Sequence, residues 1–345
     1  MRDTKYEMRD LAEDIKQKAL ELGFDLVGIT DASPIDARQV ELLAGWLKSG
    51  FAGQMDYMQK NFEKRVDPSK LLKNAQSVIC VGLNYTTPKT QLKPPVAAAL
   101  MGRVANYAQY EDYHLFIKKQ LRKLIDFIAS VVGPALQFKI CVDSVPLAER
   151  ALAARAGLGF IGKNHMLINP KLGAQIFLGE IITNLKIQPD EPIKTNCSNC
   201  DECISACPTG ALRADGQFDA SKCISYLTTV RQGHSAELSR SPHRPEQGRR
   251  IEHRDRIPAD LAEKIGDRLF GCDECVLACP YQKDAPVCKN KQLKFYNDRA
   301  KLSLGEILNL SRESFEAKFA DSVIKRSGLE RLKRNAQICL ANITR

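Results

Sequence analysis

The sequence contains no apolar run that approaches the roughly 20 residues of a membrane-spanning helix. Its opening stretch, MRDTKYEMRD, is charged and lacks the apolar segment of a secretory signal. These absences predict a cytoplasmic protein without membrane contact. The 345 residues are long enough for a substantial core, so the fold is not expected to need disulfides.

Acidic residues are fewer than basic ones, with 41 Asp and Glu against 51 Lys and Arg and a formal net charge of +10. Such an excess favours an anionic partner and does not specify a fold. Basic residues are concentrated in the His- and Arg-rich segment 231–258 and in a C-terminal group that comprises Lys325, Arg326, Arg331, Lys333 and Arg334. A solvated charged surface and contact with nucleic acid are both consistent with these runs.

Cysteine, by contrast, is abundant, with 12 residues. The pattern C-x2-C-x2-C-x3-C-P runs from Cys197 to Pro208 and is typical of iron–sulfur ligation. A second run, Cys272-x2-Cys275-x3-Cys279-Pro280, lacks one thiolate, which Cys223 could supply. In proteins with two such clusters the Cys before Pro serves the other cluster. The spacing therefore predicts two [4Fe–4S] clusters, one bound by Cys197, Cys200, Cys203 and Cys279 and the other by Cys207, Cys223, Cys272 and Cys275.

Structural zinc and a disulfide framework are the alternatives for these cysteines. Zinc closes at four ligands and rarely uses three Cys at successive three-residue steps before Cys-Pro. Disulfide frameworks belong to short secreted chains. The remaining cysteines lack motif spacing and are interpreted as structural residues; they are Cys80, Cys141, Cys288 and Cys339.

The arrangement of patterns along the chain predicts a mixed α/β or α+β protein with three parts. Residues 1–190 alternate helix-like runs with apolar strand candidates, which include FDLVGIT, SVICVGL, FKICVD and QIFLGEIIT. This alternation favours a layered α/β domain in which helices cover a sheet. Residues 191–298 form a ferredoxin-like domain organised by its clusters. Residues 299–345 contain two amphipathic helical patterns that resemble one HEAT-like pair.

One glycine motif does not indicate a nucleotide site. Residues 157–162 match G-x-G-x-x-G, but they follow the helical run LAERALAARA and lead toward a strand. A dinucleotide fingerprint needs the opposite order, with the pyrophosphate at a helix N-terminus. The sequence therefore argues against a Rossmann fold here.

Asp143 ends the strand-like run FKICV and precedes a helical run. A carboxylate at the C-terminal end of a strand in an α/β sheet is well placed for catalysis. The alternative is a helix N-cap, in which the side chain accepts backbone N–H bonds. Capping lowers the pKa of an Asp, whereas a proton donor needs a raised pKa. The residues alone leave both interpretations open.

His114 lies in DYHLFI, which resembles the start of the D-x-H-x-x-G signature of corrinoid proteins. The glycine of that signature is absent. A buried structural histidine is therefore the preferred interpretation, and His165 is interpreted in the same way.

Taken together, the motifs resemble those of the epoxyqueuosine reductase family over nearly the whole chain. The resemblance includes LGFDLVGIT, KRVDP, DYH, VDSVPLAERALAARAGLGFIGKN, both cysteine runs, CISYLT, FGCDECVLACP and KRNAQICLANI. Three features depart from the family pattern. Gln109, Tyr110 and Glu111 replace a Trp-Gly pair, segment 231–258 is longer than usual, and the C-terminal helical segment is short.

The resemblance implies cobalamin bound between the α/β domain and the ferredoxin-like domain, with no protein ligand below the cobalt. It implies that Asp143 is the proton donor. Further residues at the positions that contact cobalamin, or close to that pocket, are Arg65, Lys163, Asn164, Leu167, Leu178, Ser225 and Asp273.

The implied reaction reduces the epoxide of epoxyqueuosine in a tRNA anticodon loop to the alkene of queuosine. It implies a tRNA partner, a low-potential electron donor and a monomeric enzyme. Two other functions are considered: a cobalamin- and iron–sulfur-dependent reductive dehalogenase, and a ferredoxin-type electron carrier. The first commonly has an export signal, and the second would not need residues 1–190.

Overall fold

The structure is a computed structural model that describes residues 4–88, 100–230 and 257–345, with side chains from residue 11 onward. A four-stranded sheet in the order β1-β2-β7-β4 forms the centre of the N-terminal part. These strands are β1 (Leu26–Asp31), β2 (Ser77–Asn84), β7 (Ile176–Thr183) and β4 (Phe138–Cys141). All three pairings are antiparallel.

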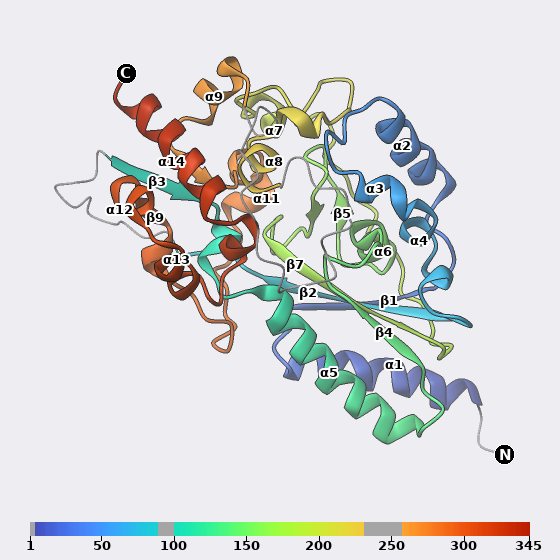
Figure 1. The fold of residues 1–345 in the computed structure, drawn as a ribbon. Helices are drawn as coiled ribbons and strands as arrows, with labels where there is room; N and C mark the ends of the chain where they lie inside the picture. The colour runs from blue at the N-terminus through green and yellow to red at the C-terminus, as the bar shows by residue number, and fades with distance from the viewer. Residues whose placement is uncertain (1–3, 89–99, 231–256) are drawn as a thin grey trace.

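Helices cover both faces of this sheet, as Figure 1 shows. Helices α1 (Thr4–Glu21) and α5 (Tyr113–Val132) lie side by side on one face, and α6 (Glu149–Arg155) lies on the other. Side chains alternate accordingly along β7: Phe177 and Ile181 belong to the core that includes α1 and α5, and Ile182 belongs to the core with α6. Gly179 lets α5 approach closely, because a Cβ there would lie 2.6 Å from Ile117 Cγ2.

The expected layered sheet covered by helices is thus confirmed. The argument that placed Asp143 at a favourable sheet edge assumed parallel strands, and that argument is wrong because every pairing is antiparallel. The glycine motif behaves as expected: residues 157–162 follow α6 and lead into the short strand β5 (Phe160–Ile161), which pairs with β6 (Leu167–Ile168).

A second sheet connects the three expected parts of the chain. Its order is β8-β3-β9, with β3 (Met101–Val104) between β8 (Arg268–Phe270) and β9 (Lys301–Ser303). Each strand comes from a different one of the ranges 1–190, 191–298 and 299–345. A shared apolar core surrounds this sheet and includes Leu269, Leu304 and Leu332. The three ranges therefore pack as parts of one body.

The C-terminal residues form α12 (Leu304–Asn309), α13 (Arg312–Lys318) and α14 (Leu329–Ile343), and α12 packs against α14. The cysteine segment consists of short helices joined by loops, namely α7 (Glu202–Ser205), α8 (Ile224–Thr229), α10 (Glu274–Leu277) and α11 (Pro280–Lys283). The other α-helices are α2 (Ala37–Lys48), α3 (Tyr57–Lys60), α4 (Phe62–Val66) and α9 (Ala259–Ile265).

Five short 3-10 helices complete this description: η1 (Pro68–Lys70), η3 (Asn106–Gln109), η4 (Ala220–Lys222), η6 (Asn297–Arg299) and η7 (Val323–Ser327). Within the described residues, no helix combines the length and apolar character needed to cross a membrane. The basic segment 231–258 lies almost entirely outside the described residues.

Candidate active site and cysteine centres

Asp143 lies in the loop between β4 and α6, with its backbone in the left-handed region at φ 53°. Helix α6 begins only at Glu149 and has Ala148 at its N-cap. The N-cap interpretation of Asp143 is therefore wrong. Left-handed backbone is unfavourable for a residue other than Gly, Asn or Asp, so the loop holds this carboxylate in a constrained position.

His114 connects Asp143 to the first turn of α5. Its Nε2 atom lies 3.0 Å from Oδ2 of Asp143, and its Nδ1 atom lies 2.7 Å from Oδ1 of Asp112. Burial lowers the pKa of His114, but the hydrogen bonds to Asp112 and Asp143 outweigh it and raise that pKa above its usual value. His114 is buried, as expected, but it also forms a hydrogen bond with the candidate proton donor.

Arg326 of η7 adds a positive charge to this group. Its Nη2 atom donates to Oδ2 of Asp112 at 2.8 Å, and its Nη1 atom lies 3.1 Å from Nε2 of His114. The C-terminal segment therefore contributes directly to the environment of Asp143. The sequence left Arg326 as part of either a solvated surface or a nucleic-acid contact; in the structure its side chain is 48% exposed and pairs with Asp112.

The pKa of Asp143 is lowered in this structure. Burial alone would raise it, but the hydrogen bond with His114 and the charges of His114, Arg150 and Arg326 have the larger combined effect. The side chain nevertheless remains 61% exposed. In this state the arrangement favours a carboxylate on Asp143 and a proton on His114, which is the opposite of the raised pKa expected for a proton donor.

Three tyrosines lie close enough to Asp143 for its charge to affect them. Burial and the charge of Asp143 raise the pKa of Tyr57, Tyr107 and Tyr113. Tyr107 is also influenced by Asp273 and Cys223, so its ring lies within electrostatic reach of both Asp143 and a cysteine of the second group. Arg65 is close enough for the charges of Glu149 and Asp143 to act on its pKa, and its Nε atom is buried without an acceptor.

The cysteines of the first predicted group line one pocket. Its lining residues are Lys163, Asn164, Ile168, Cys197, Cys200, Cys203, Cys279 and Pro280. Within the described residues, no set of three or more His, Cys, Asp and Glu side chains is placed to hold a metal ion directly. The four thiols instead surround a common space, and Cys279 lies with the run at 197–203 although it is distant in sequence.

The second predicted group is also brought together. Burial, followed by the charges of Cys223, Cys272 and Cys207, raises the pKa of Cys275. Cys279, in comparison, is influenced by Cys197 and Cys200. The neighbours of these two thiols therefore follow the two predicted groups. Cys80, Cys141 and Cys339 are fully buried, as expected for structural cysteines.

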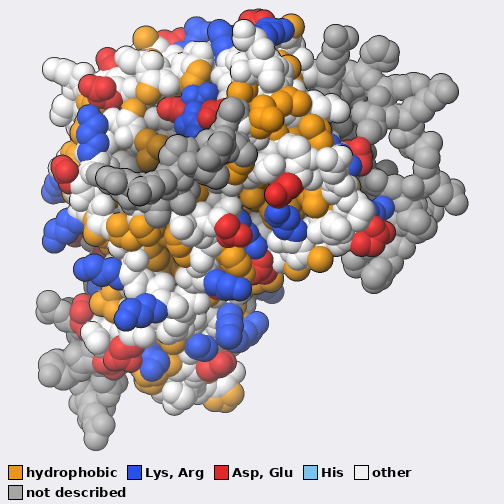
Figure 2. All heavy atoms as spheres, turned by 90° about the vertical axis from the view of Figure 1, so that its left-hand side faces the viewer, with side chains coloured by type: hydrophobic (Ala, Val, Ile, Leu, Met, Phe, Trp, Pro, Cys, Tyr) orange, Lys and Arg blue, Asp and Glu red, His pale blue; other side chains and the backbone are white. Residues whose placement is uncertain are grey.

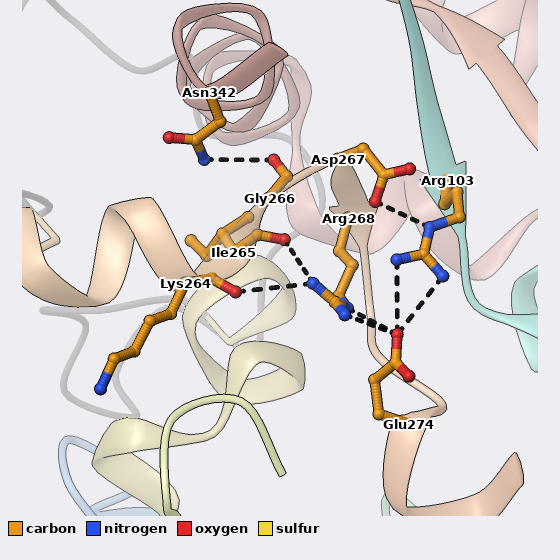
Figure 3. Close-up of polar contacts among 8 residues, drawn as sticks. All are labelled: Arg103, Lys264, Ile265, Gly266, Asp267, Arg268, Glu274 and Asn342. Carbon is orange, nitrogen blue, oxygen red and sulfur yellow. Dashed lines mark hydrogen bonds and ion pairs between the residues drawn. The ribbon is translucent and has the colours of Figure 1, made fainter. Parts of the chain in front are cut away.

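Glu274, which lies between Cys272 and Cys275 in the sequence, is held by the charged residues that Figure 3 shows. Glu274 accepts hydrogen bonds from Arg268, with its Oε1 atom 2.6 Å from Nη2, and from Arg103 at 3.3 Å. Arg103 also pairs with Asp267 at 2.7 Å. The charge of Arg268 lowers the pKa of Cys272 and so opposes the effect of burial. Both guanidinium groups are paired with carboxylates, so this network places an ion-paired cluster rather than a net positive charge next to Cys272.

The remaining predicted site residues occupy different places. Lys163 pairs with Asp201 at 2.5 Å, and its backbone N–H donates to Sγ of Cys197 at 3.4 Å. Asn164 lines the first cysteine pocket and donates to the backbone oxygen of Cys275 at 3.3 Å. These two residues thus contact the cysteine centres.

Asp273 accepts from the backbone N–H of Asn106 at 2.6 Å, and burial raises its pKa to about 6. Ser225 lies in the first turn of α8, and Leu167 is buried in β6. Leu178 of β7 packs at the edge of the core that contains α6.

Sequence reasoning missed several residues of this site. It did not assign a role to Glu149 or Tyr107, it placed Arg326 only in a basic group that could contact nucleic acid, and it treated His114 as structural. The one available signal was the position of Asp112 two residues before His114, a spacing that allows a carboxylate to contact the histidine ring from a helix N-cap. The other contacts join segments that are distant in sequence.

Comparisons with known proteins show which family the chain resembles. The family model described as epoxyqueuosine reductase QueG, DUF1730, matches residues 65–144, and the model of a 4Fe-4S double cluster binding domain matches residues 196–282. Epoxyqueuosine reductase of Vibrio cholerae is 33% identical over 335 residues, which cover 97% of this chain and 84% of that protein. The enzyme of Leadbetterella byssophila is 36% identical over 328 residues, which cover 95% of this chain and 98% of that protein.

Solved structures show the same similarity. A crystal structure of epoxyqueuosine reductase with a tRNA-Tyr epoxyqueuosine-modified stem loop has a TM-score of 0.83 at 30% identity, covering 97% of this chain and 82% of that one. A structure from Bacillus subtilis, whose catalytic aspartate loop is swung out of the active site, has a TM-score of 0.82 at 30% identity with the same coverage.

The fold and the double-cluster segment define an iron–sulfur oxidoreductase. Identity above 30% over nearly the whole chain is more specific than the class, and the chain belongs to the epoxyqueuosine reductase family.

Proposed function

We propose that this protein reduces the epoxide of epoxyqueuosine in tRNA to the alkene of queuosine. The observation that supports this most directly is the exposed Asp143 carboxylate, bonded to a buried His114 and linked through Tyr107 to the environment of the cysteine centres. The overall reaction consumes two electrons and two protons and yields the alkene and water. The site provides a proton-holding pair, and the cysteine centres provide a route for electrons.

We propose that the eight motif cysteines bind two [4Fe–4S] clusters, with Cys279 completing the group at 197–203 and Cys223 completing the other. The shared pocket of the first four thiols and the electrostatic grouping of the second four support this division. Backbone and side-chain donors from Lys163 and Asn164 approach the same centres. Such hydrogen bonds near cluster sulfurs help to set their potentials.

The residues around Asp143 suit cobalamin as a further cofactor. Arg65 offers a buried Nε–H donor without an acceptor, and Tyr57 provides a half-exposed aromatic surface beside the carboxylate. An amide side chain of cobalamin could accept the N–H of Arg65, and its ring system could pack against Tyr57. Both ring nitrogens of His114 already have hydrogen-bond partners, so this proposal does not use His114 as a metal ligand. When bound, cobalamin supplies a strongly reducing centre able to open a strained ring.

In this proposal Asp143 delivers a proton to the departing oxygen and His114 restores it. Covering Asp143 with cofactor and substrate would remove water from a carboxylate that is now 61% exposed. Desolvation disfavours the charged form and raises the pKa of an acid. Binding would therefore shift the proton of the pair from His114 toward Asp143, where general-acid catalysis needs it.

We also propose a cytoplasmic location, a tRNA anticodon stem-loop as partner, a low-potential electron donor and a monomeric state. The relative solved with a modified tRNA stem loop and the net charge of +10 support the tRNA partner. The three ranges 1–190, 191–298 and 299–345 remain our proposed domains. A dehalogenase or a simple electron carrier is not favoured, because the relatives that match nearly the whole chain are epoxyqueuosine reductases.

The decisive test is an assay of anaerobically purified, reconstituted protein on tRNA from cells that lack the final step of queuosine formation. Nucleoside mass analysis should show loss of one oxygen and conversion of epoxyqueuosine into queuosine. Protein with full iron and bound corrinoid that leaves this nucleoside unchanged under a low-potential reductant would overturn the proposal.

A further inference from the structure

A glutamate lies at the centre of the sheet, where nothing in the proposed chemistry requires it. Glu180 of β7 is 0% exposed and has Cys80 of β2 and Cys141 of β4 as its direct cross-strand partners. Directly opposite residues project from the same face of a sheet. Burial raises the pKa of both thiols, so the neighbours of Glu180 in the sheet are uncharged.

Neither carboxylate oxygen of Glu180 has a hydrogen-bond donor among the described residues. A buried ion without a donor or counter-charge is strongly disfavoured. Helix α6 packs against β7, and the carboxyl group of Glu149 in α6 lies within hydrogen-bonding reach of Glu180. Two carboxylates cannot bond to each other, but a carboxylic acid can donate to a carboxylate. With one proton held between them, one carboxyl group can donate a hydrogen bond that the other accepts.

Glu149 also contacts the catalytic loop. Its Oε1 atom accepts the backbone N–H of Asp143 at 2.5 Å. Since Asp143 has φ 53°, this hydrogen bond stabilises a backbone conformation that would otherwise be strained. Burial and the charge of Asp143 raise the pKa of Glu149 to about 7, and burial with the charge of Glu149 raises that of Glu180 further.

Other charged and titratable groups face this pair from each surrounding element. They are Arg65 of α4, Tyr113 of α5, Arg150 and Arg155 of α6, Cys80 of β2, Cys141 of β4 and Asp143 of the loop. None of the arginines donates a hydrogen bond to Glu180, whose two oxygens lack donors.

We propose that Glu149 and Glu180 share a single proton and that this protonated pair acts as a positioning device, holding the loop of Asp143 in place through the N–H of Asp143. Loss of the proton would leave two adjacent buried carboxylates beside the carboxylate of Asp143. Their repulsion would displace Glu149, the half-buried member of the pair, and release the loop. The inference rests on the proposed role of Asp143 for its catalytic consequence, but the loop itself can be observed without turnover.

The test is hydrogen exchange of the peptide that contains Val142–Glu149, measured by mass spectrometry on the full-length protein loaded with its clusters between pH 5.5 and 9. After correction for the intrinsic pH dependence of exchange, protection should fall by up to about tenfold per pH unit between the pKa of the pair in the open loop and its higher pKa in the closed loop, because opening then releases one proton, and it should level off at higher pH. In Glu180→Gln the pair can no longer become doubly charged, and the amide group can donate to Glu149. Protection in this variant should therefore stay constant with pH.

Glu149→Gln provides a second test that does not depend on the folding of Glu180→Gln, because its amide oxygen can still accept the N–H of Asp143. It should show the same constant protection, whereas the exposed Glu41→Gln should behave like the wild-type protein. Wild-type protection that does not change with pH would overturn the inference. So would a wild-type decrease that persists unchanged in Glu149→Gln. Neither result depends on conversion of epoxyqueuosine, so failure here is distinguishable from failure of the proposed function.

Discussion

At the scale of single residues, the protonation of Asp143 is determined by its contacts. The hydrogen bond with His114 and the charges of Arg150 and Arg326 lower its pKa while its side chain is exposed. The hydrogen bonds of His114 with Asp112 and Asp143 raise its pKa, against the opposing effects of burial and of the charge of Arg326. We propose that His114 holds a proton before substrate arrives and that this proton moves to Asp143 when water is excluded.

Asp143→Asn tests whether Asp143 is the donor. Asparagine keeps the size of the side chain and tolerates the left-handed backbone, but it cannot release a proton. We expect turnover to fall by about a hundredfold or more, while iron content and tRNA affinity remain unchanged. Single-turnover formation of queuosine measured by mass analysis is the readout, and Asp56→Asn on the surface of α3 is the control. Normal turnover in Asp143→Asn would assign the proton to another group.

The contacts among Asp112, His114 and Asp143 predict that the stability of the folded protein depends on pH. The folded state raises the pKa of His114 and lowers those of Asp112 and Asp143. The His114 contribution is complete below its unfolded pKa, roughly 6.5, and is lost as pH rises through the folded pKa. The Asp contributions are complete above about pH 4 and are lost as pH falls through their lowered values.

His114→Gln should therefore be most destabilising between about pH 5 and 6, where its unfolding midpoint should be about 2–4 °C below that of the wild-type protein. The difference should shrink on the alkaline side. Thermal unfolding followed by circular dichroism at several pH values measures it. A difference that grows from pH 6 to pH 9 would show that His114 is held as a neutral ring.

The sequence allowed the cysteine ligands to be predicted but not the proton-holding network. Cys197, Cys200 and Cys203 follow a local spacing that reflects the geometry of one cluster, and even Cys279 could be assigned through its following proline. By contrast, His114, Asp143 and Arg326 come from three distant segments, and Glu149 meets Glu180 only because α6 covers β7. Local patterns contain no information on such contacts between distant segments.

At the scale of secondary-structure elements, apolar periodicity predicted the sheet and its helices well. SVICVGL forms β2, which is buried throughout, and the amphipathic run beginning at DYH forms α5. Strand direction was not predictable, because a fully buried strand has the same composition in parallel and antiparallel sheets. The connection of the three ranges through β3 was also missed, since β3 has only four residues.

The cysteine loops give a prediction at this scale. Reconstituted wild-type protein should contain about eight iron atoms per chain, and Cys279→Ser should reduce this toward four by disabling one cluster. Cys80→Ser, Cys141→Ser and Cys339→Ser should retain the full iron content, because these three buried cysteines belong to neither proposed ligand group. The measurement is the number of iron atoms per chain after anaerobic reconstitution of the wild-type protein and of each variant. Full iron in Cys279→Ser, or loss of iron in any of the three controls, would show that the ligands were assigned incorrectly.

At the scale of the whole molecule, the net charge of +10 does not form a single basic field on the side that Figure 2 shows, where Lys and Arg are interspersed with acidic and apolar side chains. Four members of the C-terminal basic group have partners within the protein or are buried, although Lys325 and Arg326 remain 42% and 48% exposed. Arg326 contacts Asp112, Arg331 is buried, Arg334 donates to the backbone oxygen of Leu227 at 2.6 Å, and Lys325 pairs with Glu316 at 2.8 Å.

Exposed lysines near the active site are therefore better candidates for phosphate contacts than the C-terminal group. Lys60 and Lys64 are exposed on α3 and α4, and the backbone oxygen of Arg65, next to Lys64, accepts the N–H of Ala148 in the segment between Asp143 and α6. Each lysine that contacts a phosphate displaces counterions, so its loss weakens binding and reduces the salt dependence.

Lys60→Glu combined with Lys64→Glu should weaken tRNA binding and reduce the slope of log affinity against log salt by about one unit per lost contact. Lys119→Glu combined with Lys123→Glu makes the same change of charge on the exposed side of α5 and should alter the slope much less, because any effect at a distance is screened within about 8–10 Å. Fluorescence titration of a labelled anticodon stem-loop at several salt concentrations measures the slope for each double variant. Equal changes in both double variants would mean that tRNA responds to the overall charge of the protein, and unchanged binding in the first would exclude α3 and α4 from the interface.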